Sequence, residues 1–73
     1  MAGEQATGEH DATYDIVSVL YHALQGAEVY EEYASDAEEA GDSELARFFQ
    51  DIQQEEKRRA DRAKQLLAKR LKA

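Results

Sequence analysis

The sequence contains no cysteine and no proline, has only two histidines, and holds no long hydrophobic run. The missing cysteine excludes disulfide bonds, thiolate zinc sites and iron–sulfur clusters. The missing proline permits long uninterrupted helices, because proline breaks a helix interior. No apolar run approaches the roughly 20 residues that a membrane span requires. The two histidines, His10 and His22, are too few for a histidine-rich metal site within one chain.

The N-terminal stretch MAGEQATGEHDA is small, polar and without hydrophobic periodicity. We expect residues 1–12 to form a disordered tail, followed by one small domain that covers residues 13–73. The stretch has no basic region and no hydrophobic core, so it does not resemble a secretory signal. Without such a signal or a membrane span, the chain is expected to be cytoplasmic.

The net charge of −7 argues against nucleic-acid binding, which requires a basic surface. Residues 28–44 contain eight acids and no base, whereas residues 57–72 contain eight of the nine bases and one acid. The chain is therefore strongly dipolar. The basic segment is amphipathic, which makes a membrane or nucleic-acid surface an alternative interpretation. It lacks aromatic residues, and we expect neither a membrane nor a nucleic-acid partner.

Apolar residues recur at steps of three and four in two stretches on either side of Gly41. This spacing predicts two amphipathic helices, near 14–40 and 43–72. Thr13 and Asp42 are suitable N-caps, and Gly41 is suited to end the first helix. The residues expected to pack in the core or in a dimer interface are Ile16, Leu20, Ala23, Ala27, Tyr30, Phe48, Phe49, Ile52, Ala63 and Leu67.

A connection this short makes the two helices antiparallel neighbours, an all-α helical hairpin. Each helix has an apolar arc wider than one neighbour can bury, so a second copy is expected to complete a four-helix bundle. The charge distribution favours an antiparallel homodimer, because it places the acidic loop end of one hairpin beside the basic end of the other. Exposed ion pairs contribute only about 0–1 kcal/mol each, but loop-to-loop packing would oppose like charges.

The stretch VYEEYASDAEEAGDSELARFFQDIQQEEKRRADRAKQLL resembles the first helical pair of rubrerythrins and other ferritin-like proteins. The residues that carry the resemblance are Tyr30, Ala37, Gly41, Phe49, Glu56 and Ala60. It covers about residues 14–68 and one half of that family's antiparallel bundle. The resemblance implies a di-iron site made of a glutamate seven residues before the tyrosine and a Glu-x-x-His motif on the second helix. Here the first position is Ala23, and the histidine position is Arg59, which has no lone pair to offer a metal.

Arginine supplies a positive charge where the ferritin-like proteins hold metal. We expect Glu56 and Arg59 to form an ion-pair lock that sets the register of the dimer, since buried charges must be paired. Two alternatives are that both side chains point to solvent, and that a metal site survives. For a metal site the candidate ligands are Glu56, Glu28 and Glu31, although Glu28 and Glu31 also suit a solvated acidic face.

Two functions follow from this sequence. The first is a non-catalytic, homodimeric structural or interaction module of ferritin-like fold, without a cofactor. The alternative is a carboxylate-based iron-binding protein assembled across the dimer. Since the sequence shows no glycine-rich phosphate loop and no nucleophile–base set, hydrolase or transferase chemistry is not expected. His22 is expected to be a surface or subunit-contact residue.

Overall fold

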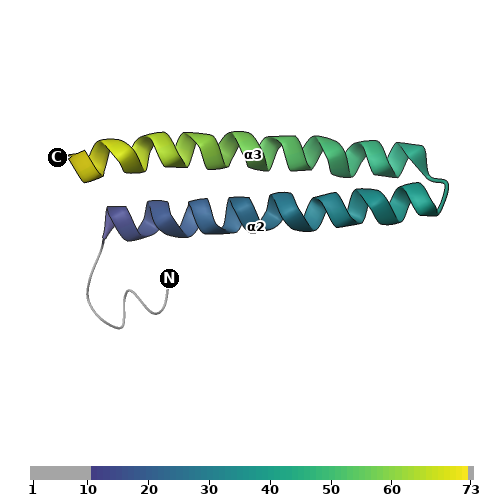
Figure 1. Ribbon diagram of the computed structural model, residues 1–73, viewed down its shortest axis with the longest axis horizontal. Helices are drawn as coiled ribbons and strands as arrows, with labels where there is room; N and C mark the ends of the chain where they lie inside the picture. Colours follow the sequence, from purple (N-terminus) through teal and green to yellow (C-terminus); the bar gives the residue numbers. More distant parts are fainter. Residues whose placement is uncertain (1–10, 73) are drawn as a thin grey trace.

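The computed structural model describes residues 11–72, which form an all-α helical hairpin (Figure 1). Helix α2 (Ala12–Glu39) and helix α3 (Ser43–Lys72) lie antiparallel and side by side, joined by residues 40–42. The predicted hairpin is confirmed. Its pairing into a four-helix bundle stays a prediction, and residues 1–10 of the expected tail lie outside the described residues.

Helix α2 begins earlier than the sequence pattern suggested. Its N-cap is Asp11, not Thr13, and the first helical residue is Ala12. One carboxylate oxygen of Asp11 accepts hydrogen bonds from the backbone N–H groups of Thr13, at 3.0 Å, and Tyr14, at 3.2 Å. An ionised carboxylate satisfies the free N–H groups of a first turn and also interacts favourably with the helix dipole. Asp11 is therefore the better cap of the two.

The turn between the helices ends α2 with a Schellman motif. The Asp42 N–H donates to the Ala37 carbonyl at 2.9 Å, and the Gly41 N–H donates to the Glu38 carbonyl at 3.0 Å. Gly41 has a φ of 77°, the left-handed conformation that this motif requires and that residues with a Cβ rarely adopt. Asp42 then caps α3, because its carboxylate accepts from the Leu45 N–H at 3.0 Å.

Gly41→Ala is expected to destabilise the hairpin by about 1 kcal/mol, because alanine is strained at positive φ. For a domain of this size the thermal midpoint should fall by roughly 4–8 °C, measured by circular dichroism. Gly26→Ala is the matched control. A Cβ at position 26 would meet its nearest side-chain atoms at 3.5 Å, an ordinary contact, so this variant should melt no lower than the parent. Equal melting of the two variants would contradict the assigned turn.

The two helices meet along a line of alanines. Every buried residue of the described chain is alanine: Ala23, Ala27, Ala34, Ala37, Ala46, Ala60 and Ala63. Small side chains let the helices approach closely, and Gln53 exploits this by donating from its amide nitrogen to the Ala27 carbonyl at 3.1 Å. Close approach of two helices over alanine removes little apolar surface from water, since alanine has few apolar atoms to bury.

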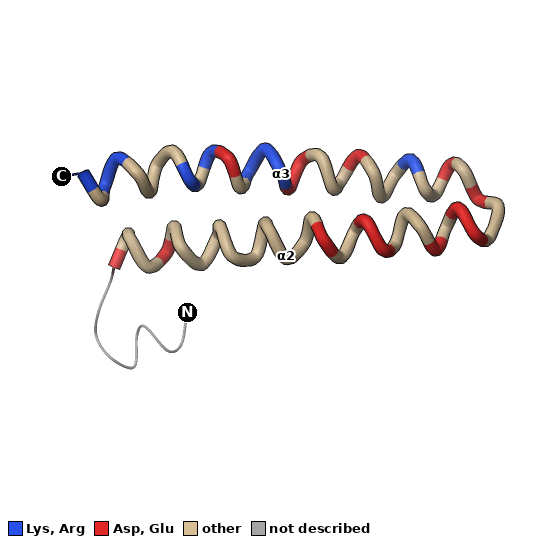
Figure 2. Tube along the Cα trace, viewed as in Figure 1, with Lys and Arg blue, Asp and Glu red and all other residues tan. Residues whose placement is uncertain are grey.

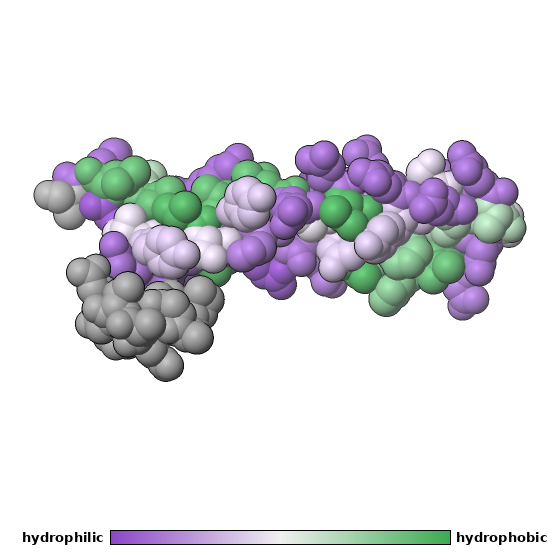
Figure 3. All heavy atoms as spheres, turned by 90° about the horizontal axis from the view of Figure 1, so that it is seen from below, coloured by the Kyte–Doolittle hydropathy of each residue, from purple (hydrophilic) through white to green (hydrophobic). Residues whose placement is uncertain are grey.

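Large hydrophobic side chains stay at the surface. Within residues 11–72 none of them is fully buried, and the exposed ones are Tyr14, Val17, Val19, Tyr21, Leu24, Tyr33, Leu45, Phe48, Leu66 and Leu71. In Figure 3 hydrophobic residues gather in two stretches, one toward the open end of the hairpin and one toward the loop. Scattered exposed apolar residues are normal, but contiguous exposed patches indicate sites of interaction.

Charge follows the long axis of the hairpin. Figure 2 shows acidic residues concentrated in both helices near the loop and basic residues in α3 toward the open end. The loop end of the hairpin is therefore acidic and the open end of α3 is basic, as the sequence indicates. Across residues 11–72, no helix combines the length and the apolar character needed to cross a membrane.

Candidate functional site

One broad side of the hairpin is hydrophobic at both ends and carries a charged pair in the middle, and we call it the groove face. It is lined by residues spaced seven apart, a spacing that keeps them on one side of a helix. These residues are Val19, Gly26 and Tyr33 on α2, and Leu45, Ile52, Arg59 and Leu66 on α3. Two hollows lie on this face, one at each end of the hairpin.

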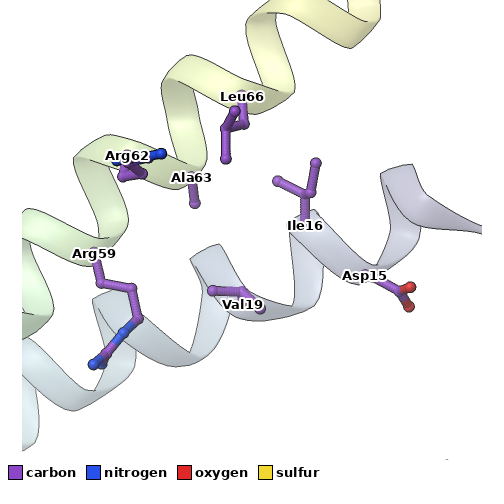
Figure 4. Close-up of a pocket in the computed structure, with 7 residues that line it drawn as sticks. All are labelled: Asp15, Ile16, Val19, Arg59, Arg62, Ala63 and Leu66. Atoms are coloured by element: carbon purple, nitrogen blue, oxygen red, sulfur yellow. The ribbon is translucent and has the colours of Figure 1, made fainter.

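The hollow at the open end is apolar at its centre and basic on one side. Figure 4 shows Ile16 of α2 and Leu66 of α3 pointing toward one another across it, with Ala63 beside them. Arg59 reaches along its edge, while Asp15 points away from the centre. An apolar side chain from another molecule would find apolar walls here on both helices.

The hollow at the loop end is lined by Tyr33, Ala37, Leu45 and Phe49, together with Asp36 and Ala40. The Tyr33 ring lies edge-on to Tyr30 and to Phe49, with centroid distances of 5.8 and 5.5 Å. Such edge-to-face pairs stabilise by about 0.5–1.5 kcal/mol beyond the area they bury. Phe48 extends this aromatic cluster outward, 5.6 Å from Phe49 and 56% exposed.

The middle of the groove face holds the charged pair that the sequence singled out. Arg59 donates from Nη1 to Glu56 Oε1 at 2.5 Å. The Glu56 side chain is 18% exposed and that of Arg59 is 55% exposed. Opposite them, Gly26 leaves room, because a Cβ there would lie 3.5 Å from Glu56 Cγ. Glu56 and Arg59 are thus paired within one chain, with the arginine reaching the surface.

The three candidate metal ligands do not come together. Glu28 and Glu31 are exposed on α2, and Glu31 lines a polar hollow with Glu38, Gln50 and Gln53. Glu56 belongs to the groove face, on the other side of the hairpin. In the part of the chain that the structure describes, no group of three or more His, Cys, Asp or Glu residues is placed to hold a metal ion.

No catalytic arrangement is assembled around the one described histidine. The Ser18 hydroxyl oxygen lies 3.5 Å from His22 Nδ1, one turn apart on the exposed surface of α2. A nucleophile of this kind needs a base that a third group orients. Within residues 11–72 the aromatic ring paired with His22 is that of Tyr21, edge-on at a centroid distance of 5.4 Å. This ring contact does not provide the hydrogen bond that would orient His22 as a base.

The expected packing residues divide into three groups. Ala23, Ala27 and Ala63 are buried, and Phe48 is exposed. The half-buried members are Ile16, Leu20, Tyr30, Phe49, Ile52 and Leu67. That set left out Leu66 and Gly26, which lie on the groove face. Their seven-residue spacing from Arg59 and Val19 is the signal that marks them.

A comparison with protein families gives one match. The family model described as phosphoinositide-specific phospholipase C, efhand-like, matches residues 18–70. No curated protein and no solved structure matches the chain.

The expected resemblance to rubrerythrins and ferritin-like proteins is wrong, because the matching family is a different one. The described residues also lack any cluster of metal ligands. The shared features have a simpler physical origin. Alanine lets two helices approach, glycine ends a helix in a tight turn, and aromatic residues fill the edges of the contact. An alanine-packed hairpin needs these residue types at these intervals whatever its family.

Proposed function

We propose that this chain, which belongs to the phosphoinositide-specific phospholipase C, efhand-like family, is a non-catalytic helical module. In this proposal it pairs with a second copy through its groove face. An EF-hand binds calcium through a 12-residue loop between its helices. Here only residues 40–42 connect α2 and α3, so the twelve-residue loop has no counterpart. Family membership therefore supports the helix pair and gives no reason to propose calcium binding.

The observation that carries the proposal is the groove face itself. The hairpin buries only alanines, while Leu45, Tyr33 and Leu66 stay 38–45% exposed on this face. Domains below about 70–80 residues usually need a disulfide, a metal or a partner chain in addition to their own core. The sequence has no cysteine and so no disulfide. A partner chain that covers the exposed groove face would supply the missing stabilisation.

The size of the face suits a dimer. Two helices of 28 and 30 residues, each about 10 Å across, present a face of roughly 900 Å². Stable protein interfaces bury about 800 Å² on each partner. Two groove faces stacked on one another would form a four-helix bundle, with the alanine lines inside each hairpin and the larger side chains between the hairpins.

The orientation follows from charge. An antiparallel dimer places the acidic loop end of each hairpin beside the basic open end of the other, with α3 lying along the partner's α3. Figure 2 makes the opposition of the two ends visible. The reverse arrangement would place acid beside acid at one end and base beside base at the other. Electrostatic complementarity of this kind selects one geometry even where it adds little affinity.

The position of the charged pair agrees with this arrangement. Helix α3 runs from Ser43 to Lys72, so Glu56 and Arg59 lie equally far from its midpoint. When two copies of α3 pair antiparallel over their full length, each Glu56 lies level with the partner's Arg59. The interface then holds two carboxylates and two guanidinium groups at its centre, which sets the register of the dimer.

Chemical cross-linking tests the proposal, and the absence of natural cysteine makes single-cysteine variants unambiguous. We expect a short bismaleimide to join Leu45→Cys of one copy to Leu66→Cys of another when the two variants are mixed. Each variant alone should not cross-link, because equivalent positions in the antiparallel dimer lie roughly 25 Å or more apart along the helix. Leu71→Cys, on the same helix but off the groove face, is the control.

Cross-linking of Leu45→Cys to itself would show a loop-to-loop dimer and reject the proposed orientation. Sedimentation equilibrium gives the second measurement. The parent chain, 8.2 kDa by composition, should sediment at twice that mass at micromolar concentration. A monomer at 100 µM would reject the homodimer altogether.

A further inference from the structure

A second hydrophobic surface lies on α2, away from the groove face. It runs along the first half of α2, where steps of three, four and three place its side chains in one row. We call it the tyrosine patch: Tyr14, Val17, Tyr21 and Leu24 of α2, with Leu71 of α3. All five are 44–72% exposed, and Tyr21, at 61%, is the most exposed of the four on α2.

The tyrosine patch is separate from the groove face. Val17 and Leu24 share their side of α2 with Glu31 and Glu38, at intervals of seven residues. Glu31 and Glu38 line the polar hollow together with Gln50 and Gln53 of α3. In Figure 3 the hydrophobic stretch toward the open end lies mainly in the upper half of the view, and the one nearer the loop lies mainly in the lower half. A dimer formed through the groove face leaves this second surface free.

The α3 side of the patch carries two exposed lysines, Lys57 and Lys64, with one exposed acid, Asp61, between them. Lys57, Lys64 and Leu71 are spaced seven apart, which places them on one side of α3. The antiparallel pairing of the helices brings Leu24 level with Lys57, and Val17 level with Lys64. A ligand for this surface therefore needs apolar side chains for the row on α2 and negative charge for the lysines of α3.

Toward the loop the same side of the hairpin becomes acidic. This negative charge disfavours large anionic ligands that would cover the whole side. Beyond Leu24 this side carries Glu28, Glu31 and Glu38, all exposed. A membrane is flat and would meet the whole side, so an anionic bilayer would be repelled by this acidic half within about one Debye length, near 8 Å. A short ligand confined to the patch avoids that repulsion.

A second copy of the chain fits the patch poorly. Antiparallel stacking of two such sides would place Tyr21 and Leu24 against the partner's acidic half. The carboxylates would then lose hydration against rings and methyl groups without a matched apolar partner, which is unfavourable. The groove face has no such mismatch, because it is hydrophobic at both ends.

From this combination we infer that the tyrosine patch binds an acidic amphipathic helix of a partner protein. The row from Tyr14 to Leu24 spans roughly 15 Å, about three helical turns. A helix of that length with apolar residues at i, i+3, i+4 and i+7 lies along the row and presents glutamate or aspartate to Lys57 and Lys64. The ligand then lies as a third helix against the exposed row of α2, with its apolar side facing the hairpin.

The probe is a fluorescein-labelled 15-residue peptide with leucine at those positions and glutamate at the flanking ones. Fluorescence anisotropy should show that it binds the full chain at least tenfold more tightly than the same peptide with lysine for glutamate. Tyr21→Ala should weaken binding at least tenfold. Ser35→Ala is the control, a neutral and exposed position on the same helix that belongs neither to the tyrosine patch nor to the groove face, and it should alter binding less than twofold. Circular dichroism establishes that both variants are helical at the concentration used.

Three results would overturn the inference. The first is equal affinity for the two peptides, or no binding of either at 1 mM. The second is sedimentation of the chain with phosphatidylserine vesicles that Tyr21→Ala abolishes, which would assign the patch to a membrane. The third is a lower sedimentation mass for Tyr21→Ala, which would assign it to a second copy. Because the patch lies within one chain, peptide binding is measurable even if the groove-face dimer is disproved.

Discussion

Leu66→Glu is expected to weaken the proposed homodimer at least about 100-fold. In the antiparallel arrangement Leu66 of each copy lies level with the partner's Phe49, near Leu45 and the acidic end of the hairpin. The substitution removes a leucine contact worth about 1.5–3 kcal/mol and puts a carboxylate into an apolar, acidic environment. Because the dimer is two-fold symmetric, it loses this leucine contact twice. Each 1.4 kcal/mol of lost binding free energy raises the dissociation constant about tenfold. Sedimentation equilibrium across a concentration series measures it.

The matched control is Leu71→Glu, the same change on the same helix. Leu71 is 72% exposed and lies on the opposite side from the groove face, so the dissociation constant should change less than twofold. An equal effect of the two variants would show that added negative charge, and not the groove face, controls association. In that case the proposed interface is wrong.

Arg59→Ala is the second change with a large expected effect. In an isolated hairpin the exposed pair of Arg59 with Glu56 contributes at most about 0.5 kcal/mol. In the dimer, removal of the arginine leaves two Glu56 carboxylates near the two-fold axis without positive charge. Breaking a buried pair in this way costs about 3–5 kcal/mol, so the dissociation constant should rise by roughly two to four powers of ten. Sedimentation equilibrium again measures it.

The double variant Glu56→Gln with Arg59→Ala separates a buried lock from an exposed pair. Once glutamate is replaced by neutral glutamine, no uncompensated charge remains, and most of the lost affinity should return. Arg58→Ala, one residue along and outside the groove face, should change the dissociation constant less than threefold. If Arg59→Ala behaves like Arg58→Ala, the pair is a surface feature and does not set the register.

Much of the fold could be predicted from the sequence because its physical determinants are local. The three- and four-residue spacing of apolar side chains placed both helices, and Gly41 placed the turn at the residue that adopts positive φ. The start of α2 was missed by two residues, since Asp11 and Thr13 are both good N-caps. Only the geometry shows that Asp11 accepts the first-turn hydrogen bonds.

The distribution of the larger side chains could not be predicted from spacing alone. A stripe indicates which side of a helix is buried, but not which of its members lies on the line of closest approach. Here alanine holds that line, so Ile16 and Phe49 are only half-buried and Phe48 is exposed. The tyrosine patch was not predicted, because its residues lie outside the expected packing set, and Glu31 and Glu38 on the same side of α2 mark it as a second surface.

The alanine line between the two helices predicts how the stability of the protein depends on temperature and concentration. Since a lone hairpin hides almost no large side chain, its folding and its association should form one coupled equilibrium. The melting temperature would then climb with protein concentration, and a diluted sample would lose helix as it loses mass. In a cell such a chain would be folded when abundant and open to proteases when scarce, so its own abundance would regulate its lifetime.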